Sequence, residues 1–233
     1  MDALAAHSEL IIKQTRRGWC QECMGCEAKT EFNVLDASKN KVFYIIEESS
    51  CCMRFCCGNA RPFEMRMHAG ADDGAPLVAH YDKPFTCCPP GACSFCCKHH
   101  IFANTADGAR LGKTEEACYI CTPTLDVFEG DTKMYSVEKA GCCRCVVFEC
   151  CRQPFDIKDA SGSKVGAVIK KFGGLQEFYT DADTFQVKFP GGSNAAQKVI
   201  LIGSVMLLNQ LFFESEKKDS KPDGAPPTQE MER

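Results

Sequence analysis

Short segments in which apolar and polar residues alternate run from residue 10 to residue 190, and they predict β-strands. This alternation places one face of each strand in a core and the other in solvent. Turn sequences rich in Asp, Asn, Gly and Ser, such as ASKN and ASGS, separate the segments. The segments that we expect to be strands are 10–14, 32–36, 41–48, 62–68, 75–81, 133–138, 145–149, 154–159, 164–170 and 184–189.

One segment near the C-terminus is apolar without alternation. Eleven of the fifteen residues in 199–213 are large and hydrophobic, and none is proline, so we predict a helix. A helix that is apolar on nearly all sides is buried either in a protein core or in a bilayer. The nineteen residues 195–213 barely reach the length of about 20 that a spanning helix needs. The unbroken apolar run is only 199–208, and it contains Gly203 and Ser204, which favours a core.

The number of strands predicts the architecture. About 180 residues, at roughly 15 per strand and turn, give on the order of 12 strands, and such a sheet removes its edges by closing. A barrel of this size is too wide for strand side chains alone to fill, so the apolar helix is its expected content. We therefore predict a mainly β protein, a closed antiparallel barrel of roughly 12 strands over residues 10–214. One central hydrophobic helix occupies about 196–213, residues 1–9 are a lead-in, and the charged, Pro-rich residues 215–233 are disordered.

An internal repeat supports this architecture. The segment 32–42, FNVLDASKNKV, shares six of eleven residues with 155–165, FDIKDASGSKV, at an offset of 123 residues. Both copies are predicted to be two strands joined by an Asp-Ala-Ser turn. We interpret the repeat as two related halves of one barrel.

Composition limits the function. A net charge of −4 argues against a nucleic-acid binder, which is normally basic. The first residues lack the apolar stretch of a secretory signal, and nineteen cysteines, an odd number, exclude a fully paired disulfide framework. A reducing compartment is therefore expected. We find no catalytic Ser/His/Asp pattern and no phosphate-binding loop, so we do not expect an enzyme.

The cysteines fall in clusters that fit several roles. Two C-x2-C pairs are separated by 21 residues, close to the spacing of a zinc ribbon, and C-x2-C presents two thiolates to one ion. The expected zinc ligands are Cys93, Cys96, Cys118 and Cys121.

A second reading assigns the cluster on the Pro-Gly segment 87–97 to acylation, because several acyl chains anchor a protein stably to a membrane. The expected acylation sites are Cys87, Cys88, Cys93, Cys96 and Cys97. The remaining cysteines are expected to pack as small hydrophobic residues.

A twelve-residue segment begins with Asp181 and Asp183, the spacing with which a calcium-binding loop starts. Phe185 and Gly192 stand where oxygen ligands would follow, so carbonyls must supplement the two carboxylates and affinity is low. The same segment also fits a turn before a strand whose alternate residues face inward. The expected weak Ca²⁺ site comprises Asp181, Asp183, Phe185, Val187 and Phe189.

Several of these segments together resemble the phospholipid scramblase family. They are CCGNARPFEMR (56–66), the double-cysteine clusters, TDADTFQVKFP (180–190), KVILIG (198–203) and FFE (212–214), in order across about 10–214. The resemblance implies a Tubby-like barrel of twelve strands around a C-terminal helix. It also implies Ca²⁺-activated, ATP-independent, bidirectional movement of phospholipids between membrane leaflets, and palmitoylation at the 87–97 cluster. A location at the cytoplasmic face of the plasma membrane follows, with attachment through acyl chains, the helix, or both.

The sequence departs from the family where Gly191 and Gly192 replace the acidic end of the calcium segment. Two alternatives therefore stay open. One is a palmitoylated peripheral membrane module that binds lipids or signals without scrambling, and the other is a zinc-stabilised interaction protein. The sequence also leaves open whether the protein forms a homo-oligomer.

Overall fold

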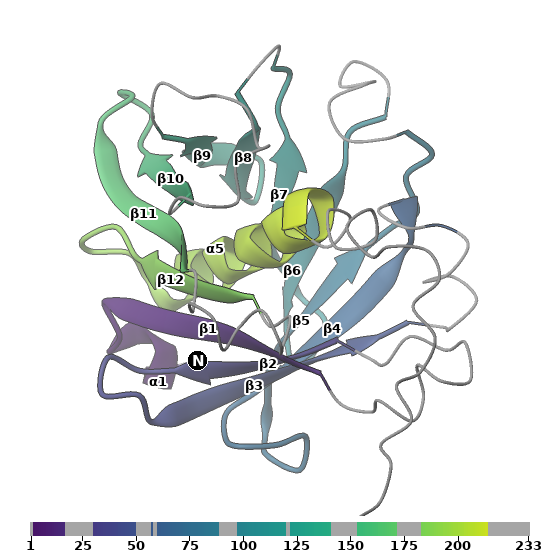
Figure 1. Ribbon diagram of the computed structural model, residues 1–233, viewed down its shortest axis with the longest axis vertical. Coiled ribbons are helices and arrows are strands. Elements are labelled where there is room, and N and C mark those ends of the chain that lie inside the picture. The colour runs from purple at the N-terminus through teal and green to yellow at the C-terminus, as the bar shows by residue number, and fades with distance from the viewer. Residues whose placement is uncertain are drawn as a thin grey trace, which may run out of the picture.

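The computed structural model describes residues 2–16, 30–49, 57, 60–88, 97–119, 122–140, 153–171 and 183–213. These residues form twelve strands that close into an antiparallel barrel around an apolar helix, which confirms the predicted fold (Figure 1). The elements are α1 (Asp2–Ala5), β1 (Glu9–Arg16), β2 (Thr30–Leu35), β3 (Lys41–Glu48), β4 (Phe63–His68), β5 (Leu77–Lys83), β6 (His100–Thr105), β7 (Arg110–Glu116), β8 (Thr124–Glu129), β9 (Thr132–Lys139), β10 (Gln153–Lys158), β11 (Lys164–Lys171), β12 (Thr184–Lys188), α5 (Ala195–Leu208) and a π-helical turn, η3 (Asn209–Phe213).

The strands follow one another around the barrel in sequence order, and β12 closes the ring against β1. At this closure Leu10 pairs with Val187 and Ile12 pairs with Phe185, and all four side chains are buried. Closure gives the first and last strands the backbone hydrogen bonds that free edges would lack. Because every strand runs antiparallel to its neighbours, successive connections lie at opposite ends of the barrel.

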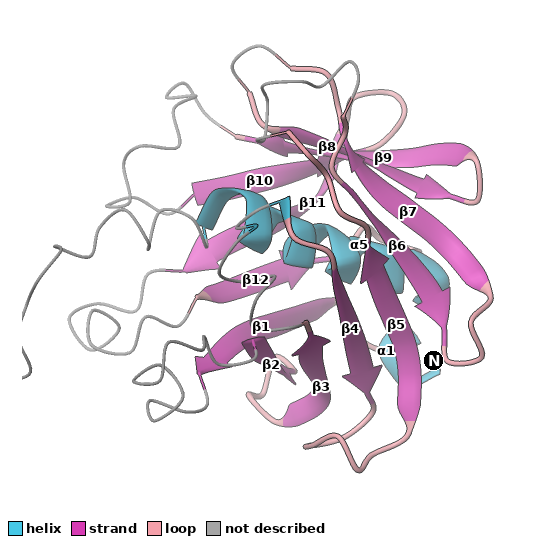
Figure 2. Ribbon diagram, turned by 90° about the vertical axis from the view of Figure 1, so that its right-hand side faces the viewer, coloured by secondary structure: helices cyan, strands magenta, loops and turns pink. Residues whose placement is uncertain are grey.

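The helix α5 with η3 lies along the inside of the barrel (Figure 2). Within the described residues, the segment Ala195–Phe213 is long and apolar enough to cross a membrane, yet 89% of its most apolar window is buried inside the protein. The barrel wall supplies inward-facing residues such as Phe32, Ile45 and Phe155, which form one core with the helix. The apolar segment is therefore a core helix in this structure, as its short unbroken run predicts.

The helix begins at a capping box. The Asn194 side chain accepts a hydrogen bond from the Gln197 amide at 2.8 Å, and the Gln197 side chain accepts one from the Asn194 amide at 3.2 Å. The Gln197 side chain also donates to Glu129 at the end of β8, with an N–O distance of 2.9 Å. The start of the helix is thereby held at one end of the barrel.

Two polar contacts attach the buried face of α5 to the wall. The Tyr81 hydroxyl donates to the Val199 carbonyl at 3.1 Å, and the hydroxyls of Thr114 and Ser204 share a hydrogen bond of 2.9 Å. All of these groups are buried, so each bond satisfies atoms that water cannot reach. At Gly203 an added Cβ would lie only 3.2 Å from the Tyr81 ring, so glycine allows this close approach.

The predicted lead-in packs against the helix. Leu4 of α1 is fully buried, and the Lys198 ammonium donates to the carbonyls of Ala5 and His7 at 2.7 and 2.8 Å. These bonds satisfy the carbonyl at the C-terminal end of the short helix α1 and a second carbonyl just beyond it. The predicted disordered tail, residues 215–233, lies outside the described residues.

Nine of the ten predicted strands match described strands, and the tenth, 145–149, lies outside the described residues. Three strands, β6, β7 and β8, were missed in the sequence. Of these, β7, with the sequence RLGKTEE, carries charged and small residues, which have low intrinsic preference for strands. Pairing with neighbours on both sides outweighs that preference here.

The repeat is real, but its interpretation as two halves is wrong. The offset of 123 residues superposes the bounds of β1, β2 and β3 on those of β9, β10 and β11, which lie eight strands further on rather than six. The hairpin β6–β7 between them has the same turn, with a positive φ at Gly108 as at Lys39 and Gly162. In each turn one amide donates to the carbonyl four residues later, Asp36 to Asn40, Thr105 to Ala109 and Asp159 to Ser163. The barrel therefore contains three copies of this hairpin, spaced four strands apart.

Candidate functional site at the cysteine end of the barrel

All nineteen cysteines belong to connections at one end of the barrel. They fall in the sequence between β1 and β2, β3 and β4, β5 and β6, β7 and β8, and β9 and β10. Since connections alternate between ends, these five leave the strands at the same end, which we call the cysteine end. The opposite end has short turns such as Gly130–Asp131 and holds the start of α5. This segregation marks the cysteine end as the candidate functional site.

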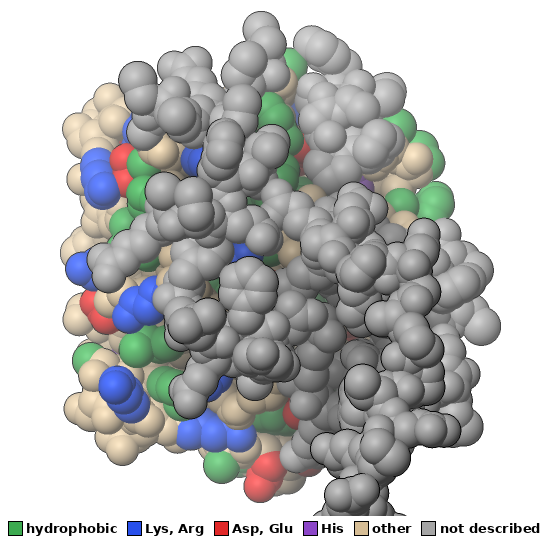
Figure 3. Space-filling model, viewed as in Figure 1, with side chains coloured by type: hydrophobic (Ala, Val, Ile, Leu, Met, Phe, Trp, Pro, Cys, Tyr) green, Lys and Arg blue, Asp and Glu red, His purple; other side chains and the backbone are tan. Residues whose placement is uncertain are grey.

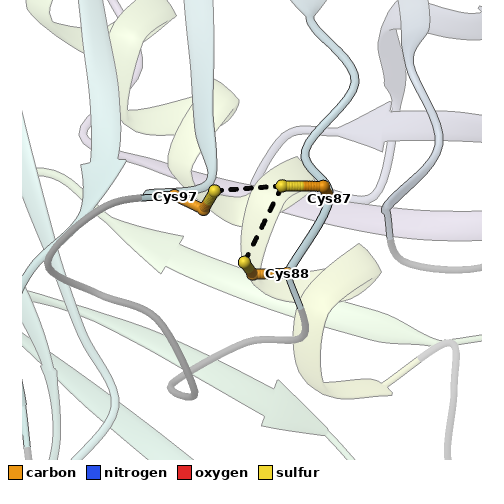
Figure 4. Close-up of side chains that lie close together, drawn as sticks. All are labelled: Cys87, Cys88 and Cys97. Atoms are coloured by element: carbon orange, nitrogen blue, oxygen red, sulfur yellow. Dashed lines mark hydrogen bonds between the residues drawn. The ribbon is translucent and has the colours of Figure 1, made fainter.

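Three cysteines of the β5–β6 connection lie together. The Sγ atom of Cys87 is 3.8 Å from that of Cys88 and 3.0 Å from that of Cys97, and all three lie within 4.8 Å of one another (Figure 4). Cys87 is exposed, and the other two are half-buried. Hydrogen bonds from the thiols of Cys97 and Cys88 lower the pKa of the Cys87 thiol, which raises its share of reactive thiolate.

The other expected acylation sites, Cys93 and Cys96, lie outside the described residues. Acylation of the cluster stays a prediction, and the described part of the cluster has the accessible thiols that it requires. Of the expected zinc ligands, Cys93, Cys96 and Cys121 lie outside the described residues, and Cys118 is exposed in the β7–β8 connection. Zinc binding by this set also stays a prediction.

An exposed aromatic ring stands beside the thiols. Phe85, two residues before Cys87, has 55% of its surface exposed. Among the described residues, no other large hydrophobic side chain is exposed. Aromatic side chains at the surface favour protein interfaces or the boundary of a bilayer. The cysteine end thus presents an apolar group next to its reactive thiols.

Two lysines on the outer face of the barrel lie near the cysteine end. Lys13 of β1 and Lys171 of β11 both pair in register with Thr184 of β12, so the three residues form one row near the cysteine end. Neither lysine forms an ion pair with any residue that the structure describes. Figure 3 shows Lys and Arg side chains on the face of the barrel where β11, β12 and β1 lie. Such cations attract anionic phosphate groups.

A buried polar layer closes the barrel at the cysteine end. Glu47 and Arg61 form an ion pair with an O–N distance of 3.2 Å, and both side chains are almost fully buried. Lys83 is fully buried and donates to the carbonyls of Arg61 and Pro84 at 3.0 and 3.3 Å. Burial and the nearby Arg61 guanidinium lower the pKa of Lys83 to about 8. The Gln210 side chain of η3 donates to the same Arg61 carbonyl at 3.4 Å, which attaches the end of the helix to this layer.

A buried histidine joins the two arms of the β5–β6 connection. The His99 ring lies 2.7 Å through Nε2 from the Cys88 carbonyl, so Nε2 carries the proton and donates it. Burial and the neighbouring Lys83 charge lower the pKa of His99 to about 4, so the ring is neutral at physiological pH. This bond holds the arm that carries Cys88 against the arm that carries Cys97.

The described part of the expected calcium segment is a buried aspartate followed by a strand that is paired on both sides. Phe185 and Val187 belong to β12, which pairs with β1 and β11 on its two sides, so their carbonyls lie within the sheet. The Asp183 carboxylate is buried 3.1 Å from the Lys170 ammonium, which also lies 3.9 Å from the Phe213 ring centre. In this structure Asp183 is therefore the ion-pair partner of a buried lysine.

Phe189 is likewise a buried core residue, as the turn-and-strand alternative predicts. Asp181 lies outside the described residues, so calcium binding by the whole segment stays a prediction.

Residues Glu47, Lys83 and His99 were missed in the sequence. Each is a polar residue near the end of a strand, where side chains usually face water, so no local signal distinguishes them. Only the closure of β3, β4 and β5 around the helix brings them into one buried layer.

Comparison with known proteins gives one consistent result. A family model described as Scramblase matches residues 1–215. The chain is 26% identical to phospholipid scramblase 1 of mouse over 97% of its own length and 65% of the relative. It is 28% identical to human phospholipid scramblase 1 over 96% of the chain and 67% of the relative. It is 26% identical to bovine phospholipid scramblase 2 over 92% and 69%. The chain thus spans about two thirds of the length of these relatives, and no solved structure matches it.

Proposed function

Because the chain belongs to the scramblase family, we propose that it moves phospholipids between the two leaflets of a membrane. The observation that carries the proposal is the match over residues 1–215, which include the whole barrel, the cysteine end and the central helix. The curated relatives with this match are named phospholipid scramblases. Movement of lipids in both directions down their gradients needs no ATP, and it makes the protein a lipid mover rather than a chemical catalyst.

The cysteine end is the part of the protein that faces the membrane in this proposal. Acyl chains on the cluster around Cys87 would enter the bilayer, and several chains give stable attachment where one does not. The exposed ring of Phe85 lies beside them, and the cations of Lys13 and Lys171 favour the anionic cytoplasmic leaflet. Reduced thiols agree with the cytoplasmic face of the plasma membrane.

The path of the lipid head groups does not run through the barrel in this proposal. The lumen is filled by α5, whose residues from Val199 to Leu208 are all buried. A polar head group would have to displace this core, so we place the path along the outside of the barrel, where the cysteine end perturbs the bilayer. Calcium activation belongs to the proposal as an open expectation, and no step of the proposal depends on it.

A second candidate function follows from the same helix. If α5 stays in the barrel on the membrane, the protein is an acylated peripheral module that binds lipids or signals without moving them. The burial of the helix favours this alternative, because the barrel needs no lipid to complete its core.

The two functions are separated by reconstituting the purified acylated protein into liposomes with fluorescent lipids in both leaflets. Dithionite destroys the fluorescence of the outer leaflet, about half of the signal, unless lipids cross during the assay. Scrambling predicts quenching well beyond half, with and without Ca²⁺ compared in parallel, and protein-free liposomes serve as the control. Quenching that stops at half for folded, vesicle-bound protein contradicts scrambling and supports the peripheral module.

A matched pair of variants tests the role of the cysteine end. Replacing the five cysteines of the 87–97 cluster by serine should detach the protein from vesicles and abolish scrambling, whereas Cys118→Ser, on a neighbouring connection, should leave both unchanged. Equal behaviour of the two variants contradicts the proposed attachment. The five replaced residues are Cys87, Cys88, Cys93, Cys96 and Cys97.

A further inference from the structure

The three clustered thiols carry an inference that does not rest on lipid movement. Their Sγ atoms come from two arms of one connection and converge on a common point between them (Figure 4). We propose that Cys87, Cys88 and Cys97 form a binding site for a thiol-seeking divalent cation, of which Zn²⁺ is the main biological example. This set shares no residue with the zinc ribbon that the spacing of the C-x2-C pairs predicts.

The distances fit tetrahedral coordination. Zinc binds thiolate sulfur at about 2.3 Å, so two sulfurs on one tetrahedral ion lie about 3.8 Å apart. The distance between the Sγ atoms of Cys87 and Cys88 is 3.8 Å. The distance from Cys87 to Cys97 is 3.0 Å, so binding requires the Cys97 arm to move outward by somewhat less than 1 Å. The arrangement is thus close to what three ligands of one ion need.

The surrounding structure holds these thiols in place before the ion arrives. His99, fully buried, bonds through Nε2 to the Cys88 carbonyl at 2.7 Å and lies two residues after Cys97. It therefore ties both arms to the barrel near the start of β6. A partner of this kind outside the ligands improves metal affinity because it limits the motion of the ligands. The exposure of Cys87 gives the ion a route of entry.

Binding is an exchange of protons for metal. Each thiol loses its proton to solvent when its sulfur bonds to Zn²⁺, so occupation of the site releases up to three protons and affinity rises with pH. A sulfur bonded to zinc has no free thiolate with which to attack an acyl donor. The metal and an acyl chain therefore compete for the same sulfurs, and the occupied form of the cluster resists acylation.

The test uses the full-length, reduced, metal-free protein in solution without lipid, so its result is independent of scrambling. Zn²⁺ is added, and native mass spectrometry counts the ions bound per chain. We expect Cys87→Ser to lose one bound ion relative to the unchanged protein and Cys118→Ser to keep it. An unchanged count in Cys87→Ser overturns the proposal. Loss of the ion in Cys118→Ser also overturns it and favours the ribbon.

A second measurement needs no variant, so it does not depend on the folding of one. The unchanged protein is alkylated with and without Zn²⁺, and the modified peptides are quantified by mass spectrometry. Zinc should slow the alkylation of Cys87, Cys88 and Cys97 together by at least tenfold, and that of Cys118 by much less. Protection of one of the three thiols alone, or equal protection of all four, overturns the shared site.

Discussion

Removing the hydrogen bond between Ser204 and Thr114 tests whether α5 stays in the barrel when the protein is on a membrane. The two hydroxyls lie 2.9 Å apart, and both side chains are fully buried. Ser204→Ala leaves the Thr114 hydroxyl buried without this partner, which costs about 1–3 kcal/mol of unfolding free energy. Thr114→Val alone should cost less, because the Ser204 hydroxyl still donates to the Ile200 carbonyl at 3.3 Å. The double variant removes both polar groups and should be more stable than the sum of the single effects predicts.

The quantity to measure is the coupling energy of this double-mutant cycle. We expect about 1 kcal/mol, the net value of a buried hydrogen bond between neutral groups. Urea unfolding, monitored by circular dichroism, gives the coupling energy in solution. Hydrogen exchange of the α5 amides gives the coupling energy on vesicles. The control cycle pairs Ser204→Ala with Thr124→Val, because the Thr124 hydroxyl donates to the Thr122 carbonyl at 2.9 Å and does not contact Ser204.

Each outcome has a direct meaning. Coupling in solution and on vesicles shows that the helix remains in the barrel, which supports a lipid path outside it. Coupling that vanishes on vesicles shows that the helix leaves the barrel and contacts lipid. A coupling energy in solution below about 0.3 kcal/mol, as for independent sites, would refute the placement of the helix itself.

Three further predictions concern the barrel wall and the cysteine end. Gly112→Ala should lower the urea midpoint and cost about 2–3 kcal/mol, because its Cβ would lie 2.1 Å from a carbonyl oxygen of β8. Gly191→Ala, with open space around it, is the control, and equal midpoints would contradict this reasoning. The pKa of Lys83 is about 8 in the fold against an ordinary 10.5, so the unfolded chain binds more protons between these values. Stability should therefore rise by roughly 2 kcal/mol from about pH 7 to about pH 9.5 relative to Lys83→Met, whereas parallel pH profiles would exclude this shift. Asp183→Asn should cost about 3 kcal/mol with or without Ca²⁺, because it leaves the buried Lys170 charge without this ion pair. A loss seen only in Ca²⁺ would instead assign Asp183 to calcium binding.

The candidate site could be predicted only in part. The cluster at 87–97 stands out in the sequence because five cysteines lie within eleven residues, and the structure brings Cys87, Cys88 and Cys97 together. The sequence did not predict which cysteines lie close together, because the expected zinc ligands were chosen by C-x2-C spacing along the chain and not by distance in space. For the calcium segment, the sequence pattern suggested a site, and the structure places most of the described residues elsewhere. Its Asp-x-Asp spacing suggested a loop, and the pairing of β12 on both sides placed its later residues in the sheet.

Patterns along the sequence were enough to predict the fold class of the protein. Period-two alternation, repeated turns and one wholly apolar segment were sufficient for a closed barrel around a helix, because these patterns depend on local preference and on the need to bury apolar surface. Tertiary structure alone decided which polar residues became buried and which connections share an end. Glu47, Arg61 and Lys83 are separated along the chain and meet only after the sheet closes. All nineteen cysteines belong to connections that leave the strands at one end, because antiparallel strands return every second connection to the same side.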